Sequence, residues 1–266
     1  MKIVPQIEEL RQHINHYWIV EDSQRLFQAS VKVFGYPGIR PEIILNLKGY
    51  LTYSYLGKTY KTQKSILASH IDSNFLFDAE QLEQFIIVQF KPRSIASLLP
   101  FTNYSGRQLK ENSLCYFEDV FERANRLENN LRGKAASTCC EILDEFFWDI
   151  MNPNVNGFLL DLLYELPFNA GIVDILEKTG YSISTLERYI KNETGLTPKK
   201  FLSLRKYKAA LEEINLDENP DWQYYIHKYH YFDQSHFIKT IKHFTNFTPS
   251  QIVANSNLIS FRPKYF

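Results

Sequence analysis

The sequence predicts an α+β protein in which an antiparallel β-barrel precedes a set of helices. Between Ile19 and about Asn103, short runs rich in Val, Ile, Phe, Tyr and Thr alternate with turn residues, as in antiparallel barrels and sandwiches. After about Asn112, apolar residues instead recur at spacings of three and four, which is typical of one face of a helix. Because 266 residues exceed the usual size of one domain, we expect more than one core.

Residues 1–110 are expected to form the barrel. Leu56-Gly57-Lys58 lies between two alternating runs and predicts a tight hairpin. The same region places four tyrosines at mostly even spacing, namely Tyr50, Tyr53, Tyr55 and Tyr60. These side chains would suit the lining of a ligand pocket, but alternation along a half-buried strand explains the same pattern, and we favour that explanation.

Residues 111–152 are expected to form a helical linker of two helices that meet near Arg132-Gly133. Its two apolar stripes are Leu114, Phe117, Val120, Phe121, Ala124 and Leu127, and then Cys139, Ile142, Leu143, Phe146 and Phe147. Asn152-Pro153-Asn154 interrupts this pattern and marks the expected start of an all-α domain over 153–254, with a tail over 255–266.

Several classes of function find no support in the sequence. The three cysteines, Cys115, Cys139 and Cys140, lack zinc-ligand spacing and are interpreted as packing residues. The strand-rich segment between Ile19 and about Asn103 holds a single histidine, His70, so no metal site is predicted there. We find no Ser/His/Asp arrangement and no phosphate-binding glycine loop, and expect neither an enzyme nor a cofactor. No apolar run has the length of a signal or membrane-spanning segment, which favours a cytoplasmic protein.

Two stretches of the all-α region share one plan. The first covers 172–201 and the second 222–252. Each consists of a short helix, a turn containing a tyrosine, a helix of about a dozen residues and a Thr-Pro pair. Ser182 and Asp233 are expected to cap the longer helices, and the Thr-Pro pairs to start the helices that follow. About seven helices fit between Val155 and Ala254.

This plan is typical of a helix-turn-helix unit, in which a braced second helix packs one face inward and presents the other to the major groove. The expected buried faces are Leu186, Tyr189 and Ile190, and Phe237, Ile241 and Phe244. The expected exposed faces are Ser184, Glu187, Arg188 and Lys191, and Gln234, Ser235, Ile238, Lys239 and Lys242. Arg and Gln near the helix start suit base edges, whereas Lys191 and Lys242 suit phosphates.

The distance between the two units and the local charge both fit double-stranded DNA. A connecting helix of about eighteen residues would span ~27 Å, which is of the order of one DNA turn, so both helices would enter successive major grooves. Net charge is zero overall, yet residues 166–266 hold 13 Lys and Arg against 10 Asp and Glu. This small excess has the sign expected for a nucleic-acid module.

With these motifs in place, the chain resembles the AraC family of transcriptional regulators. The matching residues are Gly180-Tyr181-Ser182, Leu186-Glu187-Arg188, Thr194-Gly195-Leu196-Thr197-Pro198, Arg205, Ala209-Ala210-Leu211, Tyr231, Asp233-Gln234-Ser235-His236-Phe237, Lys242-His243-Phe244 and Phe247-Thr248-Pro249. The resemblance implies sequence-specific promoter binding, with Ser184, Glu187, Arg188, Gln234, Ser235 and Lys239 at base-facing positions. It further implies a cupin-like sensor barrel for a small-molecule effector, homodimerisation through the helical linker, and contact with RNA polymerase.

The chain departs from the family pattern at two positions. His230 and Asn246 stand where the family usually has glycine. Asn tolerates a left-handed backbone well, whereas His230 would be strained if its site requires positive φ. Glu187 also places an acid on the DNA-facing surface, where it would accept a hydrogen bond from cytosine or repel phosphate. The alternative function is a ligand-binding or enzymatic barrel whose helical module serves protein contacts.

Overall fold

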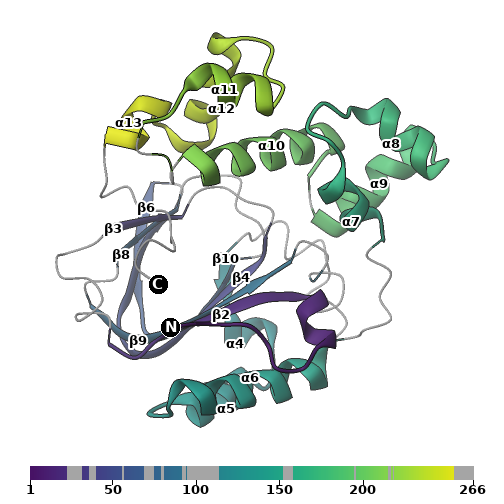
Figure 1. The fold of residues 1–266 in the computed structure, drawn as a ribbon. Coiled ribbons are helices and arrows are strands. Elements are labelled where there is room, and N and C mark those ends of the chain that lie inside the picture. The colour runs from purple at the N-terminus through teal and green to yellow at the C-terminus, as the bar shows by residue number, and fades with distance from the viewer. Residues whose placement is uncertain are drawn as a thin grey trace.

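The computed structural model describes residues 1–22, 32–35, 40–55, 57–68, 75–78, 81–91, 94, 114–151, 158–194, 196–214, 217 and 219–254. Figure 1 shows the sheets with helices below them and a second group of helices above. The first turn of the chain after its opening strand is a 3-10 helix, η1 (Glu9–Gln12). The N-terminal half thus contributes the sheets, and the C-terminal half is helical.

A six-stranded antiparallel sheet forms the centre of the N-terminal half. Its strands follow the order β1-β2-β9-β4-β7-β10, and their bounds are β1 (Lys2–Ile3), β2 (Ile14–Val20), β9 (Leu82–Phe90), β4 (Glu42–Gly49), β7 (Ile66–Ala68) and β10 (Leu114–Tyr116). The central strands β4 and β9 are rich in buried Ile, Leu, Val and Phe side chains, which fit a pleated surface covered on both faces.

A second antiparallel sheet has the order β3-β8-β5-β6, with β3 (Lys32–Gly35), β8 (Phe75–Asp78), β5 (Leu51–Tyr55) and β6 (Lys58–Thr62). Tyr55 pairs with Lys58 across the predicted hairpin, and Gly57 takes a φ of 75° in its turn. The predicted α+β class with antiparallel strands is therefore confirmed. Within the described residues, these strands form two sheets and do not close into one barrel.

Three helices cover one face of the six-stranded sheet: α4 (Phe117–Val120), α5 (Ala124–Leu131) and α6 (Ala136–Ile150). The predicted pair of helices around Arg132-Gly133 is confirmed as α5 and α6. The first stripe is not one continuous helix, because Leu114 to Tyr116 form β10 on the edge of β7. Its other members, from Phe117 to Leu127, are buried as expected, packed with Tyr17 and Phe90 of the sheet.

Asp144 fastens the start of the chain to α6. Its carboxylate accepts hydrogen bonds from the backbone N–H of Gln6 at 2.6 Å and of Ile7 at 3.1 Å, and from the Tyr17 hydroxyl at 2.8 Å. Only 3 % of Asp144 is exposed, so these three donors replace water around a buried acid. Burial, together with the neighbouring Asp144, raises the pKa of Tyr17 far above its ordinary value.

The opposite face of β2 contributes to a smaller core that includes Trp18, Phe85 and Ile87. His16 lies on that face, with its ring 5.4 Å from the Trp18 ring. It is buried, and its Nε2 atom has no hydrogen-bond partner among the described residues. Burial, followed by the positive charges of Lys2 and Arg40, lowers the pKa of His16 to about 3. The histidine is therefore held neutral in the folded protein.

The described cysteines, Cys115, Cys139 and Cys140, are free thiols. The adjacent pair is buried, as predicted, and Cys115 is half-buried. Burial raises the pKa of Cys115 to about 12 and that of Cys140 to about 11. In the described residues, no three or more His, Cys, Asp or Glu side chains gather as metal ligands would, and His70 lies outside them. None of the described helices combines the length and apolar character needed to cross a membrane.

Seven helices make up the described part of the C-terminal half, in agreement with the predicted number. They are α7 (Phe158–Glu165), α8 (Ile172–Thr179), α9 (Ile183–Thr194), α10 (Pro198–Ile214), α11 (Trp222–Lys228), α12 (Gln234–Thr245) and α13 (Pro249–Ala254). In Figure 1, α10 runs horizontally between α8 and α9 at one end and α11 to α13 at the other. Phe201 and Tyr207 of α10 are fully buried in the core that joins the two groups.

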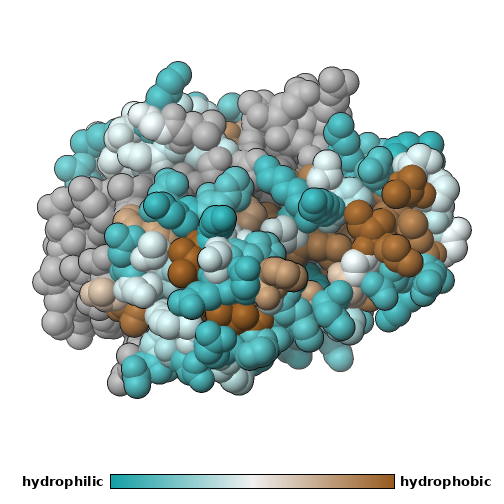
Figure 2. All heavy atoms as spheres, turned by 90° about the horizontal axis from the view of Figure 1, so that it is seen from above, coloured by the Kyte–Doolittle hydropathy of each residue, from teal (hydrophilic) through white to brown (hydrophobic). Residues whose placement is uncertain are grey.

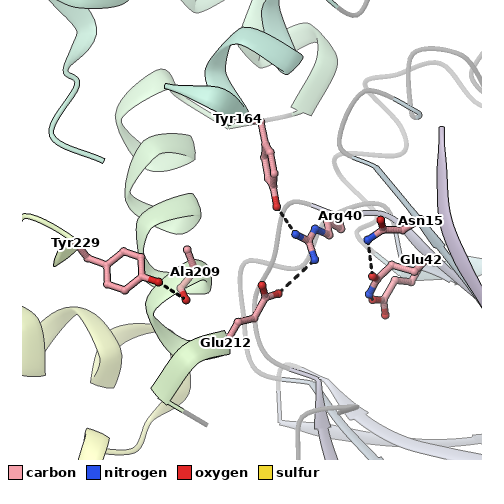
Figure 3. A network of polar contacts seen from close by, with 8 residues as sticks. Asn15, Arg40, Glu42, Tyr164, Ala209, Glu212 and Tyr229 are labelled. Carbon is pink, nitrogen blue, oxygen red and sulfur yellow. Dashed lines mark hydrogen bonds and ion pairs between the residues drawn. The ribbon is translucent and has the colours of Figure 1, made fainter. Parts of the chain in front are cut away.

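The two halves of the chain meet at Arg40, which precedes β4. Its guanidinium pairs with the carboxylate of Glu212 on α10 at 3.4 Å and donates to the hydroxyl of Tyr164 on α7. Figure 3 shows Arg40 between these two side chains, with Asn15 and Glu42 of the sheet to its right. The guanidinium carbon also lies 5.6 Å from the centre of the Tyr164 ring. One cation therefore links the sheet to two helices of the C-terminal half.

Candidate DNA interface

The long helix of each repeated stretch starts at the predicted cap. In the first, the Ser182 hydroxyl accepts a hydrogen bond from the backbone N–H of Thr185 at 3.2 Å. In the second, the Asp233 carboxylate accepts from the backbone N–H of His236 at 2.6 Å. A side-chain oxygen at this position satisfies one of the unpaired N–H groups of the first turn and stabilises the helix by about 1 kcal/mol. Both predicted caps are thus confirmed.

The Thr-Pro pairs also start helices as predicted. Pro198 and Pro249 are the first residues of α10 and α13. The Thr197 hydroxyl accepts from the N–H of Lys200 at 3.3 Å. At Thr248 the arrangement is reciprocal, because its hydroxyl accepts from the N–H of Gln251 while its own N–H donates to the Gln251 side chain. Proline fits this position because it has no N–H to leave unpaired.

The turn between α11 and α12 requires a left-handed residue, which is His230. Its φ is 51°, and α11 ends with two backbone hydrogen bonds, from Tyr231 to Ile226 at 2.9 Å and from His230 to His227 at 3.1 Å. This pair of bonds is the Schellman ending of a helix, in which the left-handed position is usually glycine. Gly180 takes a φ of 68° in the corresponding turn between α8 and α9. His230 therefore has the positive φ at which strain is expected for a non-glycine residue.

Asn246 also ends its helix, α12, in a left-handed conformation, with a φ of 63°, and its N–H is bonded to the carbonyl of Lys242, four residues earlier, at 2.9 Å. An asparagine side chain tolerates this conformation better than most non-glycine residues do. Gly195, the corresponding residue after α9, lies outside the described residues. Both family departures are thus accommodated by backbone that keeps its left-handed turn.

The inward faces of the two long helices are as predicted. Leu186, Ile190, Phe237, Ile241 and Phe244 are buried in one core, and Tyr189 is half-buried at its edge. Ile238 was expected on the exposed face, but it is half-buried against the same core. Its apolar side chain lies one position from Phe237 and turns toward the protein instead of the solvent.

Eight polar and charged residues that were predicted at the outward faces are all exposed. They are Ser184, Glu187, Arg188 and Lys191 on α9, and Gln234, Ser235, Lys239 and Lys242 on α12. The two faces differ in charge, because α9 mixes acids with bases whereas α12 carries lysines and no acid. The surface of α12 is therefore the more favourable one for a polyanion.

Arg205 of α10 holds α7 in place. Its guanidinium donates to the carbonyls of Leu163, Tyr164 and Pro167, the last two at 3.0 and 3.1 Å, and lies 4.8 Å from the centre of the Phe168 ring. Burial lowers the pKa of Arg205 from its usual value. The carbonyls at the end of α7 carry the negative end of the helix dipole, which a cation stabilises. The sequence had matched Arg205 to the family without assigning it this role.

Apolar side chains on the surface of this region were not predicted. Figure 2 shows one group of apolar side chains at the end of the molecule formed by α8 and α9, and others nearer the middle of the view. Val173 is 66 % exposed and Ile183 is 55 % exposed. Phe232, in the turn before α12, is 90 % exposed. The sequence around these residues does not indicate that they are exposed, because a large apolar residue with polar neighbours in the sequence is more often buried.

The geometry defines a protein with two helix-turn-helix units joined by one helix. In keeping with this, residues 175–255 match the family model described as "Helix-turn-helix domain". The C-terminal part of the chain is therefore similar in sequence to helix-turn-helix domains of the AraC type. No curated protein matches the chain in a sequence search.

Among solved structures, the chain is similar to the protein ToxT from Vibrio cholerae strain SCE256. An apo variant of ToxT superimposes with a TM-score of 0.52 at 10 % identity, covering 90 % of this chain and 95 % of the other. Wild-type ToxT with a bound unsaturated fatty acid gives a TM-score of 0.51 at 12 % identity, covering 92 % of this chain and 96 % of the other. The shared feature is the fold, sheets and helices together, over about nine-tenths of this chain.

Proposed function

We propose that this protein is a sequence-specific transcription regulator that places α9 and α12 in successive major grooves of promoter DNA. The observation that carries the proposal is the position of α9 and α12 at the two ends of α10, together with the exposure of their polar residues. With 17 residues, α10 is ~25 Å long at 1.5 Å per residue, close to the ~34 Å of one DNA turn once the width of the flanking helices is added.

Each exposed residue has a proposed role on the DNA. Ser184, Arg188, Gln234, Ser235 and Lys239 lie in the first half of a recognition helix and contact base edges. Lys191 and Lys242 lie about one turn later and contact phosphates. Glu187 either accepts a hydrogen bond from cytosine or keeps phosphate away. A preference for cytosine at the base pair that it faces would identify the first role.

The N-terminal half is proposed to control this binding. We assign residues 1–110 to effector binding, 111–152 to self-association and 153–254 to DNA, with 255–266 as a tail. ToxT with bound fatty acid supports a small-molecule effector, since it has the same fold over most of both chains. A homodimer would double the footprint on DNA. RNA polymerase is a further proposed partner, and no catalytic step is assigned to the protein.

The experiment that tests the proposal is selection of genomic DNA fragments on the purified full-length protein, followed by anisotropy titrations at two salt concentrations. We expect one shared sequence to be enriched and its affinity to fall steeply with salt, because each neutralised phosphate releases counterions. The double variant Arg188→Ala/Lys239→Ala should weaken binding to the selected site at least tenfold, since one bidentate base contact is worth about 1–3 kcal/mol.

A matched control removes the same charge elsewhere. Lys2 on β1 and Arg11 on η1 are both exposed, and they lie far along the chain from α9 and α12 and outside the segment assigned to self-association. The double variant Arg11→Ala/Lys2→Ala should leave affinity within about twofold of wild type, because distant exposed charges are screened at physiological salt. Equal losses in both double variants, or no enrichment of any sequence, would contradict the proposal and favour a helical module for protein contacts.

A further inference from the structure

Phe232 is the most exposed of the large apolar side chains in the described part of the chain, at 90 %. It lies in the short turn between Tyr231 and Asp233, directly before the recognition helix α12. Isolated apolar residues are common on protein surfaces, so exposure alone does not indicate a function. What sets Phe232 apart is the way the turn around it is built.

The backbone on both sides of Phe232 is fixed. On one side, Tyr231 is buried, with its ring 5.0 Å from that of Phe237. On the other side, Asp233 caps α12 through the N–H of His236. The N–H of Phe232 itself donates to Nδ1 of His236 at 3.4 Å. The phenyl ring is therefore held out into solvent by an ordered turn.

Phe232 also does not fill the structural role usual for its position. An apolar residue just before the capping residue often packs against the fourth residue of the helix, which here is Phe237. The surface of Phe237 is instead contacted by Tyr231 and by Trp222, whose ring centre lies 6.3 Å away. In the first unit the residue just before the capping residue Ser182 is Tyr181, which is 36 % exposed and whose ring lies 6.5 Å from the Tyr189 ring. Phe232 has no comparable packing.

We propose that Phe232 is a specificity-determining residue that contacts the C5-methyl group of a thymine in the major groove. The inference rests on the proposed function and extends it to a base that the polar residues of α12 do not read. A phenyl ring offers no hydrogen bond to a base edge, and the thymine methyl is the apolar group displayed in that groove. Gln234 and Ser235, both exposed, follow Phe232 at the start of the helix.

Asp233, beside Phe232, uses its carboxylate to cap α12, and the charge on the exposed face of that helix favours DNA over a protein partner. The exposed face of α12 continues from this turn through Ser235 to Lys239 and Lys242, and the helix has no acidic residue. A polyanion seated on the two lysines would place a groove against the start of the helix, where Phe232 projects. Desolvation of both the ring and the methyl group would then stabilise the complex.

The test uses the duplex selected by the full-length protein, with each thymine replaced in turn by deoxyuridine, which lacks only the methyl group. For the wild type we expect one position per bound unit at which this replacement weakens binding about threefold to fivefold, the value of burying one methyl group. For Phe232→Ala the same replacement should have no effect, and its overall affinity should be about tenfold lower, since a partly buried ring is lost. Phe232→Leu keeps an apolar side chain and should retain the penalty.

The control variant is Tyr224→Ala, which removes another exposed aromatic ring, 51 % exposed, from α11. It should keep the full deoxyuridine penalty. Thermal melting of all variants checks folding, and Phe232→Ala should melt as the wild type does because Phe232 is 90 % exposed. An identical pattern of deoxyuridine penalties in wild type and Phe232→Ala would overturn the inference, and the ring would then be assigned to a protein partner. In that case salt-dependent binding to the selected DNA would leave the proposed function standing. Loss of all DNA binding in the wild type would overturn both.

Discussion

Arg40 and Glu212 are separated by 172 positions in the sequence, yet their side chains form an ion pair of 3.4 Å. Glu212 belongs to α10, the same helix that sets the spacing between α9 and α12. Arg40 therefore connects the sheet to the element on which the proposed DNA geometry depends (Figure 3). A change in the sheet near Arg40 would act directly on the position of that helix.

Replacing Arg40 by alanine should loosen the contact between the two halves. The Arg40 side chain is 25 % exposed and that of Glu212 is 45 % exposed, so we expect a loss of about 1 kcal/mol, above that of a fully exposed pair. Small-angle scattering should report a larger radius of gyration, and calorimetry should show a lower temperature for the first unfolding transition. Lys48→Ala is the control, because it breaks the exposed pair with Glu83 within the sheet. Equal behaviour of the two variants would contradict a linking role for Arg40.

Arg205→Met should destabilise the C-terminal half by about 3 kcal/mol, since it leaves the buried carbonyl of Leu163 and the partly buried carbonyls of Tyr164 and Pro167 without their donor. Arg205→Lys should recover little, because one ammonium group cannot reproduce the fork of a guanidinium. Lys199→Met, at an exposed position on the same helix, should be nearly neutral. Chemical denaturation of the three variants checks these values, and a neutral Arg205→Met would show that α7 is held by apolar packing alone.

The elements that could be predicted from the sequence are those set by local chemistry. Ser182, Asp233, Thr197 and Thr248 cap helices through bonds that span three residues, so their signal is contained in the adjacent sequence. The buried faces of α9 and α12 follow from helical spacing for the same reason. The exposure predicted for Ile238 was wrong because the burial of a residue at the edge of such a face depends on how neighbouring helices pack.

The features that escaped prediction depend on contacts between distant segments. Residues 114 to 116 fit a helical stripe, but they pair with β7 because that strand offers a free edge. Arg40 meets Glu212, and Arg205 meets the end of α7, across long separations in the chain. The exposure of Phe232 was also hidden, since the neighbouring Tyr231 occupies the packing position that its own side chain would otherwise take.

Acid should destabilise the N-terminal half through His16. The folded state lowers the pKa of this histidine to about 3, whereas an unfolded histidine titrates near 6.5. Below pH 6.5 the unfolded state therefore binds the proton more readily, and stability falls as the pH drops toward 3. Between pH 7.5 and 5 this amounts to about 2 kcal/mol of unfolding free energy, most of it below 6.5.

Two variants isolate this effect from that of other titrating groups. His16→Asn and His16→Phe cannot take up the proton, and they differ in size and polarity. Both should lose the same part of the pH dependence, as measured by urea unfolding at pH 7.5, 6.5, 5.5 and 5, even if their stabilities at pH 7.5 differ. A slope unchanged from the wild type in both variants would show that His16 does not carry the acid sensitivity.

The left-handed turn at His230 leads us to predict a substitution that stabilises the protein. His230→Gly should raise the free energy of unfolding of the C-terminal half by about 1 kcal/mol, because glycine adopts a φ of 51° without steric cost. The hydrogen bond that residue 230 accepts from the Lys206 ammonium at 3.0 Å is made by its backbone carbonyl, so it remains when the histidine side chain is removed. Thermal denaturation should show the gain.

The control for this prediction is the same substitution three residues earlier. His227 is exposed within α11, where glycine costs about 1 kcal/mol relative to good helix formers, so His227→Gly should lower stability while adding the same freedom to the unfolded chain. The difference between the two variants therefore measures the backbone strain at His230. If His230→Gly were as destabilising as His227→Gly, the histidine would have to be stabilising the turn through its side chain, and the departure from glycine would be a gain for this domain instead of a cost.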